Sequence, residues 1–309
     1  MTPHQKTLRE GFLYGLGAYG IWGLVPLYFH SVSSIPALEL LAHRTVWSFL
    51  LLVGLLTLLK RWPDIRRTLQ DRRTCAMLLV SAFLLATNWY GYIMSVFTGR
   101  VMEASLGYFM LPFANVAFGM LFFKEKLRPL QGVALVIAGF GIARMTWAYG
   151  TMPWLAIYLT ISFGLYGVMR KMTPVDGLLG FALETFFLLP CAAAYLIYLL
   201  VAGEMKFMHP HTQVDWLVLF GAVVTTTPLV CFAQAVRRIG LISIGFIQYL
   251  SPVMQMLIAV YILGEEFSES RQVSFIFVWL GLIVFTVDTV RLMREKKPDT
   301  TSVEALEVD

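Results

Sequence analysis

Five ionisable side chains lie inside long apolar segments of this sequence: Glu39, His43, Arg44, Glu184 and Asp288. In a helix that crosses a lipid bilayer, each such charge costs about 2.5–3.5 kcal/mol on insertion scales. Residues of this kind therefore bind a substrate or an ion, or pair with one another. They are the first candidates for chemistry in this chain.

Arg44 and Glu184 are the deepest of these charges, and they are separated by 140 positions, an offset that recurs along the chain. The rise of a helix places them about 8 Å apart along the normal of a bilayer. The sequence thus predicts that they approach each other or a shared cavity. They could form a central charge pair that meets substrate, or a structural ion pair that locks two halves together.

Glu39 and His43 are spaced i, i+4 and share one helix face. Because histidine titrates near neutral pH, His43 could take up a coupling proton. The alternative is a hydrogen-bonded histidine near the membrane surface. Asp288 lies close to the end of its segment, where a carboxylate reaching the interface explains it.

Uncharged polar and aromatic residues complete the candidate substrate or coupling-ion site. Polar side chains in apolar segments are expected to face protein or a water-filled cavity, whereas the aromatic ones could equally serve packing. Besides Arg44, Glu184 and His43, the candidates are Trp22, Asn88, Glu103, Tyr108, Gln234, Gln248 and Tyr249. Further polar residues that could face a cavity are Asn115, Thr225, Thr226, Thr227, Ser251 and Gln255. Pro112 and Pro252 each remove a helical hydrogen bond and are predicted to kink or hinge their helices.

The elements that position these residues are membrane helices. The chain has 309 residues, of which 58% are hydrophobic and only 14% charged, and its mean hydropathy is +0.71. Soluble domains carry about 25% charged residues. Ten segments are long enough to span a bilayer, which predicts an all-α membrane protein with ten transmembrane helices: 10–29, 36–59, 74–97, 102–123, 129–148, 151–170, 177–202, 213–236, 242–263 and 271–292.

The positive charges predict the orientation. With the N-terminus in the cytoplasm, 19 of the 24 Lys and Arg residues, Arg170 among them, fall on the inner side, 4 fall on the outer side, and Arg44 lies within a span. Cytoplasmic loops are enriched in these residues, so both ends are predicted to be cytoplasmic (N-in/C-in). Charges spread along membrane edges favour contact with anionic lipid, not with nucleic acid.

The recurring offset of 140 predicts an internal repeat. It pairs Pro112 with Pro252, Glu125 with Glu265 and Gly141 with Gly281, and Gly20-Ile-Trp-Gly23 has a counterpart in Gly164-Leu-Tyr-Gly167. Five spans per copy is an odd number, so the second copy enters the membrane inverted. We expect a first repeat at 1–148, a second, inverted repeat at 149–293 and a disordered cytoplasmic tail at 294–309.

Six motifs are spread over most of the chain: Ala18–Gly23, His43–Trp47, Glu103–Phe109, Tyr166–Lys171, Thr225–Phe232 and Gly245–Pro252. They resemble the drug/metabolite transporter superfamily in its EamA branch, and most closely the RarD type, the chloramphenicol-sensitive protein family. The resemblance implies a ten-helix, N-in/C-in export-type carrier with a 5+5 inverted repeat. EamA proteins often have Gly-Glu after the fourth and ninth spans. Gly264-Glu265 fits this pattern, whereas Lys124-Glu125 departs from it by having lysine in place of glycine.

Inverted repeats are typical of secondary transporters that work by alternating access. The sequence therefore predicts a carrier that moves small metabolites or drug-like molecules across the cytoplasmic (inner) membrane and that could use protons as the coupling ion. Export as the direction of transport is what the resemblance implies. No catalytic motif, metal-ligand spacing or cofactor site is recognised, and the three cysteines suit apolar packing. The alternatives are a membrane sensor or scaffold that does not transport, and an intramembrane enzyme.

Overall fold

Helices make up nearly all of the protein. The computed structural model describes residues 3–98, 100–208, 212–262 and 269–295, in which no strand occurs. The helices are α1 (Pro3–Ser31), α2 (Ala37–Leu58), α3 (Trp62–Gln70), α4 (Arg72–Phe97), α5 (Val101–Phe123), α6 (Pro129–Tyr149), α7 (Trp154–Met172), α8 (Gly177–Ala202), α9 (Thr212–Arg238), α10 (Leu241–Ile247), α11 (Leu250–Tyr261) and α12 (Glu269–Glu295).

Seven helices in the described part of the chain are long and apolar enough to cross a membrane: α1, α2, α4, α5, α6, α8 and α9. Shorter apolar stretches occupy Leu241–Gln255 and Trp279–Asp288. Each of the ten predicted segments overlaps a helix, and α10 and α11 share the ninth. Arg294 and Glu295, predicted to open the tail, still belong to α12; the rest of the tail and Gly264-Glu265 lie outside the described residues.

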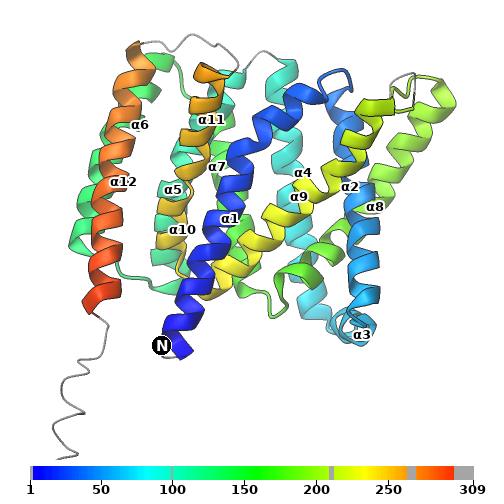
Figure 1. Ribbon diagram of the computed structural model, residues 1–309, viewed down its shortest axis with the longest axis horizontal. Coiled ribbons are helices and arrows are strands. Elements are labelled where there is room, and N and C mark those ends of the chain that lie inside the picture. The colour runs from blue at the N-terminus through cyan, green and yellow to red at the C-terminus, as the bar shows by residue number, and fades with distance from the viewer. Residues whose placement is uncertain (1–2, 99, 209–211, 263–268, 296–309) are drawn as a thin grey trace, which may run out of the picture.

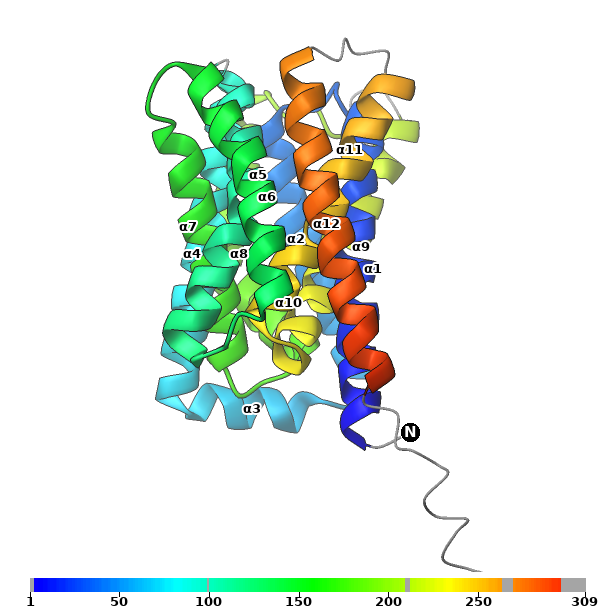
Figure 2. The same cartoon turned by 90° about the vertical axis from the view of Figure 1, so that its left-hand side faces the viewer.

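The long helices stand side by side as a bundle (Figure 1). The start of α1 and the last turns of α12 lie at the same end, which we call the N-terminal end; the other is the opposite end. The short helix α3 runs across the N-terminal end (Figure 2). Helices α6 and α12 pack against each other at one edge, as both views show.

Pro252 explains why α10 and α11 are separate helices. A proline cannot donate to the carbonyl four residues earlier, here that of Gln248. The chain breaks at this point, and the N–H of Ser251 donates to the Gln248 carbonyl instead, at 3.1 Å. Pro112, its predicted partner in the repeat, lies within the continuous helix α5. The break leaves Gln248 between two helices, near the middle of the bundle.

Arg61 connects α3 to the start of α8. Its Nη2 lies 2.7 Å from Oδ2 of Asp176, and Oδ1 of Asp176 accepts the N–H groups of Leu178 and Leu179. Burial raises the pKa of the Asp176 carboxyl, but the bonds from Arg61 and the helix N–H groups outweigh it and hold the pKa below its usual value.

Because its pKa is lowered by folding, Asp176 stabilises the protein above the pKa of the unfolded carboxyl, about 3.9, and that contribution is lost as the pH falls through the folded value. Asp176→Asn, which keeps a capping side chain but not the charge, is therefore expected to lower the melting temperature at pH 7. The gap to the wild type should narrow towards pH 3. The melting temperatures are measured by thermal unfolding of the purified protein in detergent. A difference between variant and wild type that does not change with pH would contradict this account.

Candidate functional site

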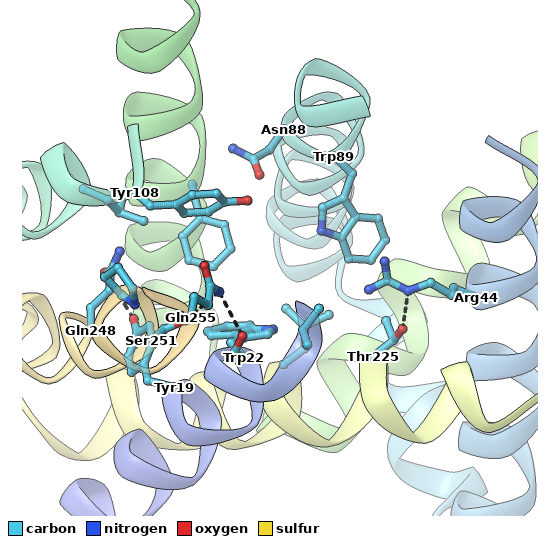
Figure 3. Close-up of a pocket in the computed structure, with 15 residues that line it drawn as sticks. Tyr19, Trp22, Arg44, Asn88, Trp89, Tyr108, Thr225, Gln248, Ser251 and Gln255 are labelled. Atoms are coloured by element: carbon cyan, nitrogen blue, oxygen red, sulfur yellow. Dashed lines mark hydrogen bonds between the residues drawn. The ribbon is translucent and has the colours of Figure 1, made fainter. Parts of the chain in front are cut away.

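A cavity of about 140 Å³ lies inside the bundle. Its walls come from α1, α2, α4 and α5 of the first half and from α7, α9 and α10–α11 of the second. The lining residues are Tyr19, Trp22, Val25, Arg44, Asn88, Trp89, Tyr108, Leu111, Phe163, Thr225, Leu229, Gln248, Ser251, Pro252 and Gln255. Figure 3 shows Arg44 and Thr225 on one side of this central cavity, Gln248 and Ser251 on the other, and the rings of Trp22 and Tyr108 between them.

Arg44 is the charged residue of the central cavity. Its Nε donates to the hydroxyl of Thr225 at 2.7 Å, and its guanidinium carbon lies 5.4 Å from the ring centroid of Trp89 and 5.5 Å from that of Phe29. Among the described residues, no Asp or Glu forms a salt bridge with it. The cation is thus positioned by a hydroxyl and two aromatic faces.

The other side of the cavity is an amide network. Oε1 of Gln248 accepts from Nδ2 of Asn115 at 2.8 Å and from the hydroxyl of Tyr19 at 3.3 Å. Nε2 of Gln255 donates to the carbonyl of Trp22 at 2.9 Å. Pro26 lies four residues after Trp22 and cannot satisfy that carbonyl, so Gln255 takes the place of the missing helical donor.

Asn88 connects the cavity to α7. Its Nδ2 donates to the carbonyl of Leu159 and to the hydroxyl of Ser162, both at 2.9 Å. The side-chain carbonyl of Asn88 remains on the cavity side as an acceptor. Asn88 therefore joins the two halves and supplies a polar atom to the lining.

A second cavity, of about 400 Å³, opens towards the opposite end of the bundle, beside the turn between α1 and α2. Arg44 and Trp89 line both cavities and so lie between them. The other lining residues are Phe29, Val32, Ser33, Ile35, Pro36, Ala37, Leu40, Leu41, Tyr92 and Ile93.

The predicted approach of Arg44 to Glu184 is wrong. Glu184 is fully buried away from the cavity and accepts hydrogen bonds from Ser81, from the Tyr166 hydroxyl at 3.3 Å and from Arg170 Nη1 at 3.3 Å. Arg170, assigned above to the cytoplasmic edge, is also fully buried. Its long side chain turns back into the bundle, a direction that a count of loop charges cannot reveal.

The remaining candidates divide between the cavity and structural contacts. Trp22, Asn88, Tyr108, Gln248 and Pro252 line the cavity, whereas His43, Glu103, Gln234, Tyr249 and Pro112 do not.

The structural contacts account for several of the residues that do not line the cavity. Glu103 accepts the N–H of Leu155 at the start of α7 at 2.7 Å, and Gln234 accepts a bond from Arg238. Tyr249 is packed in the core. Glu39 accepts the N–H groups of Lys206 and Phe207 at 2.9 and 2.8 Å.

His43 lies 3.8 Å from Glu39, close to the ring of Phe207 and away from the cavity. The coupling role of His43 stays a prediction.

Of the lining residues absent from the sequence candidates, Tyr19 and Phe163 occupy matched positions of the two halves. Each directly precedes the first glycine of the matched motifs Gly20–Gly23 and Gly164–Gly167. Extending the repeat comparison by one residue would have found them. Helix α8, which carries the candidate Glu184, contributes no lining residue, because its polar face is used by the Arg170–Glu184 cluster.

Gly180 is needed beside that cluster. A Cβ built on it would lie 2.0 Å from Nη1 of Arg170. Since the guanidinium is fully buried and bonded to Glu184, it cannot move aside without breaking the pair. We expect Gly180→Ala to destabilise the protein by about 1–3 kcal/mol.

The matched control is Gly54→Ala on α2, where an added Cβ meets nothing within 4 Å. Alanine favours helix over glycine, so this variant should be neutral or more stable. Equal losses in both variants, measured by denaturant unfolding in detergent, would contradict the packing account.

The fold and the cavity together define a class: a multi-pass helical membrane protein with an aromatic and polar cavity inside its bundle. A crystal structure of a protein with 17% sequence identity has the same fold, with a TM-score of 0.68 over 91% of this chain and 98% of that one.

The model of the EamA-like transporter family matches residues 9–147 and again 151–287. An "uncharacterized transporter" of Vibrio cholerae is 40% identical over 94% of this chain and 96% of its own length. "Protein RarD" of Escherichia coli is 36% identical, over 94% and 98%. The "chloramphenicol-sensitive protein RarD" of Pseudomonas aeruginosa is 30% identical, over 93% and 97%. The chain belongs to the EamA-like transporter family, as a RarD-type member, and is a multi-pass inner-membrane protein.

Proposed function

We propose that this protein is a secondary transporter that exports small metabolites or drug-like molecules by alternating access, with the central cavity as its substrate site. The observation that carries the proposal is that both halves of the chain contribute walls to one polar and aromatic cavity. Sites between repeats near mid-membrane are typical of secondary transporters.

The proposed architecture has ten spans in two inverted repeats, 1–148 and 149–293, with both termini in the cytoplasm. It is supported by the two successive family matches and by the common end at which α1 begins and α12 finishes. A reporter that is active only outside the cytoplasm should then be silent after residue 65, beside α3, and active after residue 205. The reverse pattern would overturn the orientation.

The structure corresponds to one state of the proposed cycle. A large apolar cluster that includes Tyr166, Phe232 and Val236 packs six long helices and α10 together on one side of the cavity. The second cavity lies on the other side, towards the opposite end. With the proposed orientation this state is closed to the cytoplasm and faces outwards.

Glu125 connects the two halves of the chain at the closed, N-terminal end of the bundle. Its carboxylate accepts the N–H groups of Leu241 and Ile242 at the start of α10, at 2.9 and 3.0 Å, and pairs with Lys171 at 3.1 Å. The preceding Lys124 has the left-handed φ of 53° that glycine adopts without strain. The turn of the family's Gly-Glu motif is thus formed here with lysine. Inward opening requires these bonds between the halves to break.

Counterflow in proteoliposomes tests the proposed function. Purified protein, loaded inside with an unlabelled compound, should accumulate the labelled form of a substrate transiently and saturably from a panel of anionic, neutral and cationic metabolites. A pH gradient should change the rate if protons are coupled. A sensor, a scaffold or an intramembrane enzyme would show no accumulation of any panel member, and that result would contradict the proposal.

A further inference from the structure

The charge pattern of the two cavities points to the kind of molecule they accept. Arg44 is the one charged residue in either lining within the described part of the chain. Its guanidinium has five N–H donors, and the one hydrogen bond described for it, from Nε to Thr225, leaves the terminal nitrogens without a protein acceptor. A cation held at this depth without a counter-ion favours an anionic ligand.

The geometry around Arg44 suits a carboxylate in particular. Thr225 fixes Nε, and the faces of Phe29 and Trp89 hold the guanidinium plane. A guanidinium fixed in this way presents parallel N–H groups that match the two oxygens of a carboxylate. Tyr28, Tyr92 and Tyr108 are the other titratable groups that interact with Arg44 electrostatically, and all three are neutral as phenols.

The other lining residues indicate the shape and the polar groups of the rest of the ligand. Rings of Trp22, Trp89, Tyr108 and Phe163 form the walls, so a planar apolar body fits between them. At the far side, Nε2 of Gln255 is already used as a donor to the Trp22 carbonyl and to Ser251, which leaves its carbonyl oxygen as an acceptor. Nε2 of Gln248, whose Oε1 is taken by Asn115 and Tyr19, offers a donor on the same side. An amide acceptor and an amide donor suit a neutral polar group of the ligand.

The same charge pattern selects against zwitterions and cations. Arg44 repels an ammonium group held near it, and neither lining contains an Asp or Glu that would offset this repulsion. We propose that the substrates are small monoanionic organic acids with a planar ring, bound by a carboxylate on Arg44. This assignment rests on the central cavity being the transport site.

Four ring compounds of one size and different charge test the inference: 3-phenylpropionate, its neutral amide, zwitterionic phenylalanine and cationic phenethylamine. Binding to the purified full-length protein is measured by quenching of tryptophan fluorescence, because Trp22 and Trp89 line the cavity. We expect the anion to bind at least about tenfold more tightly than the amide and the two ammonium compounds, which is the worth of a charge-assisted hydrogen bond.

Arg44→Gln should bring the ratio of anion to amide binding close to one while amide binding persists. Arg44→Lys should keep part of the preference, and Arg144→Gln, on α6 away from the lining, should keep all of it. Gel filtration and amide binding show whether each variant is folded. If Arg44→Gln does not fold, the wild-type protein is treated with phenylglyoxal, which modifies arginine side chains, and modification of Arg44 is measured with and without the anion. The anion should protect Arg44, and a lack of protection would overturn the inference.

Equal binding of all four probes, tighter binding of an ammonium compound, binding of none at millimolar concentration, or a preference that survives Arg44→Gln would overturn the inference. Anion-selective binding without counterflow would uphold Arg44 as the binding site for a carboxylate and remove the proposed transport function. Counterflow of neutral or cationic compounds alone would overturn the inference and leave the proposed transport function standing.

Discussion

Replacing Glu184 with alanine is expected to lower the free energy of unfolding by about 3–5 kcal/mol, because it leaves the guanidinium of Arg170 buried without a counter-ion. Both side chains are fully buried, and Ser81 and Tyr166 cannot neutralise the cation. Arg170→Ala should cost a similar amount by leaving the carboxylate alone. The double variant Arg170→Ala/Glu184→Ala should be more stable than the sum of the two losses predicts.

A double-mutant cycle measured by unfolding in detergent tests this coupling. Arg61 and Asp64, a partly exposed pair 2.8 Å apart, form the matched control and should show coupling of about 0–1 kcal/mol. The cycle between Arg44 and Glu184, which share no partner, should be additive. Strong coupling there, or none between Arg170 and Glu184, would show that the charges are paired differently from the structure.

Glu125→Ala is expected to destabilise the closed N-terminal end by about 2–4 kcal/mol, since it removes charge-assisted hydrogen bonds to two helix N–H groups and to Lys171. The carboxylate lies against Gly119 and Gly240, where added Cβ atoms would be 2.8 and 2.6 Å from its Oε2. Its loss should therefore shift the population towards the proposed inward-open state.

The control for Glu125 is Glu10→Ala. Glu10 pairs with Arg238 at 3.6 Å with 42% of its side chain exposed, so its removal should change stability by less than about 1 kcal/mol. The readout is the cytoplasmic accessibility of a cysteine at Ser251, which should rise in Glu125→Ala and stay unchanged in Glu10→Ala. Equal accessibility in both variants would mean that Glu125 does not hold this end closed.

Much of the fold and part of the site follow from the sequence. Hydropathy predicts the helical bundle, and polar residues in apolar segments identify Arg44, Asn88 and Gln248 on the cavity. Because burying a polar side chain in a membrane costs free energy, such residues are rare in apolar segments, and those that occur can be recognised from the sequence.

The direction of long side chains does not follow from the sequence. Arg170 stands near the end of α7, where either interface or core is within its reach, and only the packing against Gly180 and Glu184 decides between them. The offset of 140 predicts that Arg44 and Glu184 are equivalent positions of a repeat. Equivalence does not bring two residues together unless both face the same cavity, and Glu184 faces α7 and α4 instead.

Accessibility of the central cavity from both sides of the membrane tests the account most directly. Ser251→Cys is introduced after Cys75, Cys191 and Cys231 have been replaced with serine, and a membrane-impermeant methanethiosulfonate reagent is applied to right-side-out and to inverted vesicles. Ser251 lines the cavity. The control is Ile283→Cys on α12, because Ile283 is 59% exposed and does not line the cavity. Alternating access predicts labelling of Ser251→Cys in both vesicle types and of Ile283→Cys in neither; labelling of Ser251→Cys from one side alone, or from neither, would contradict it.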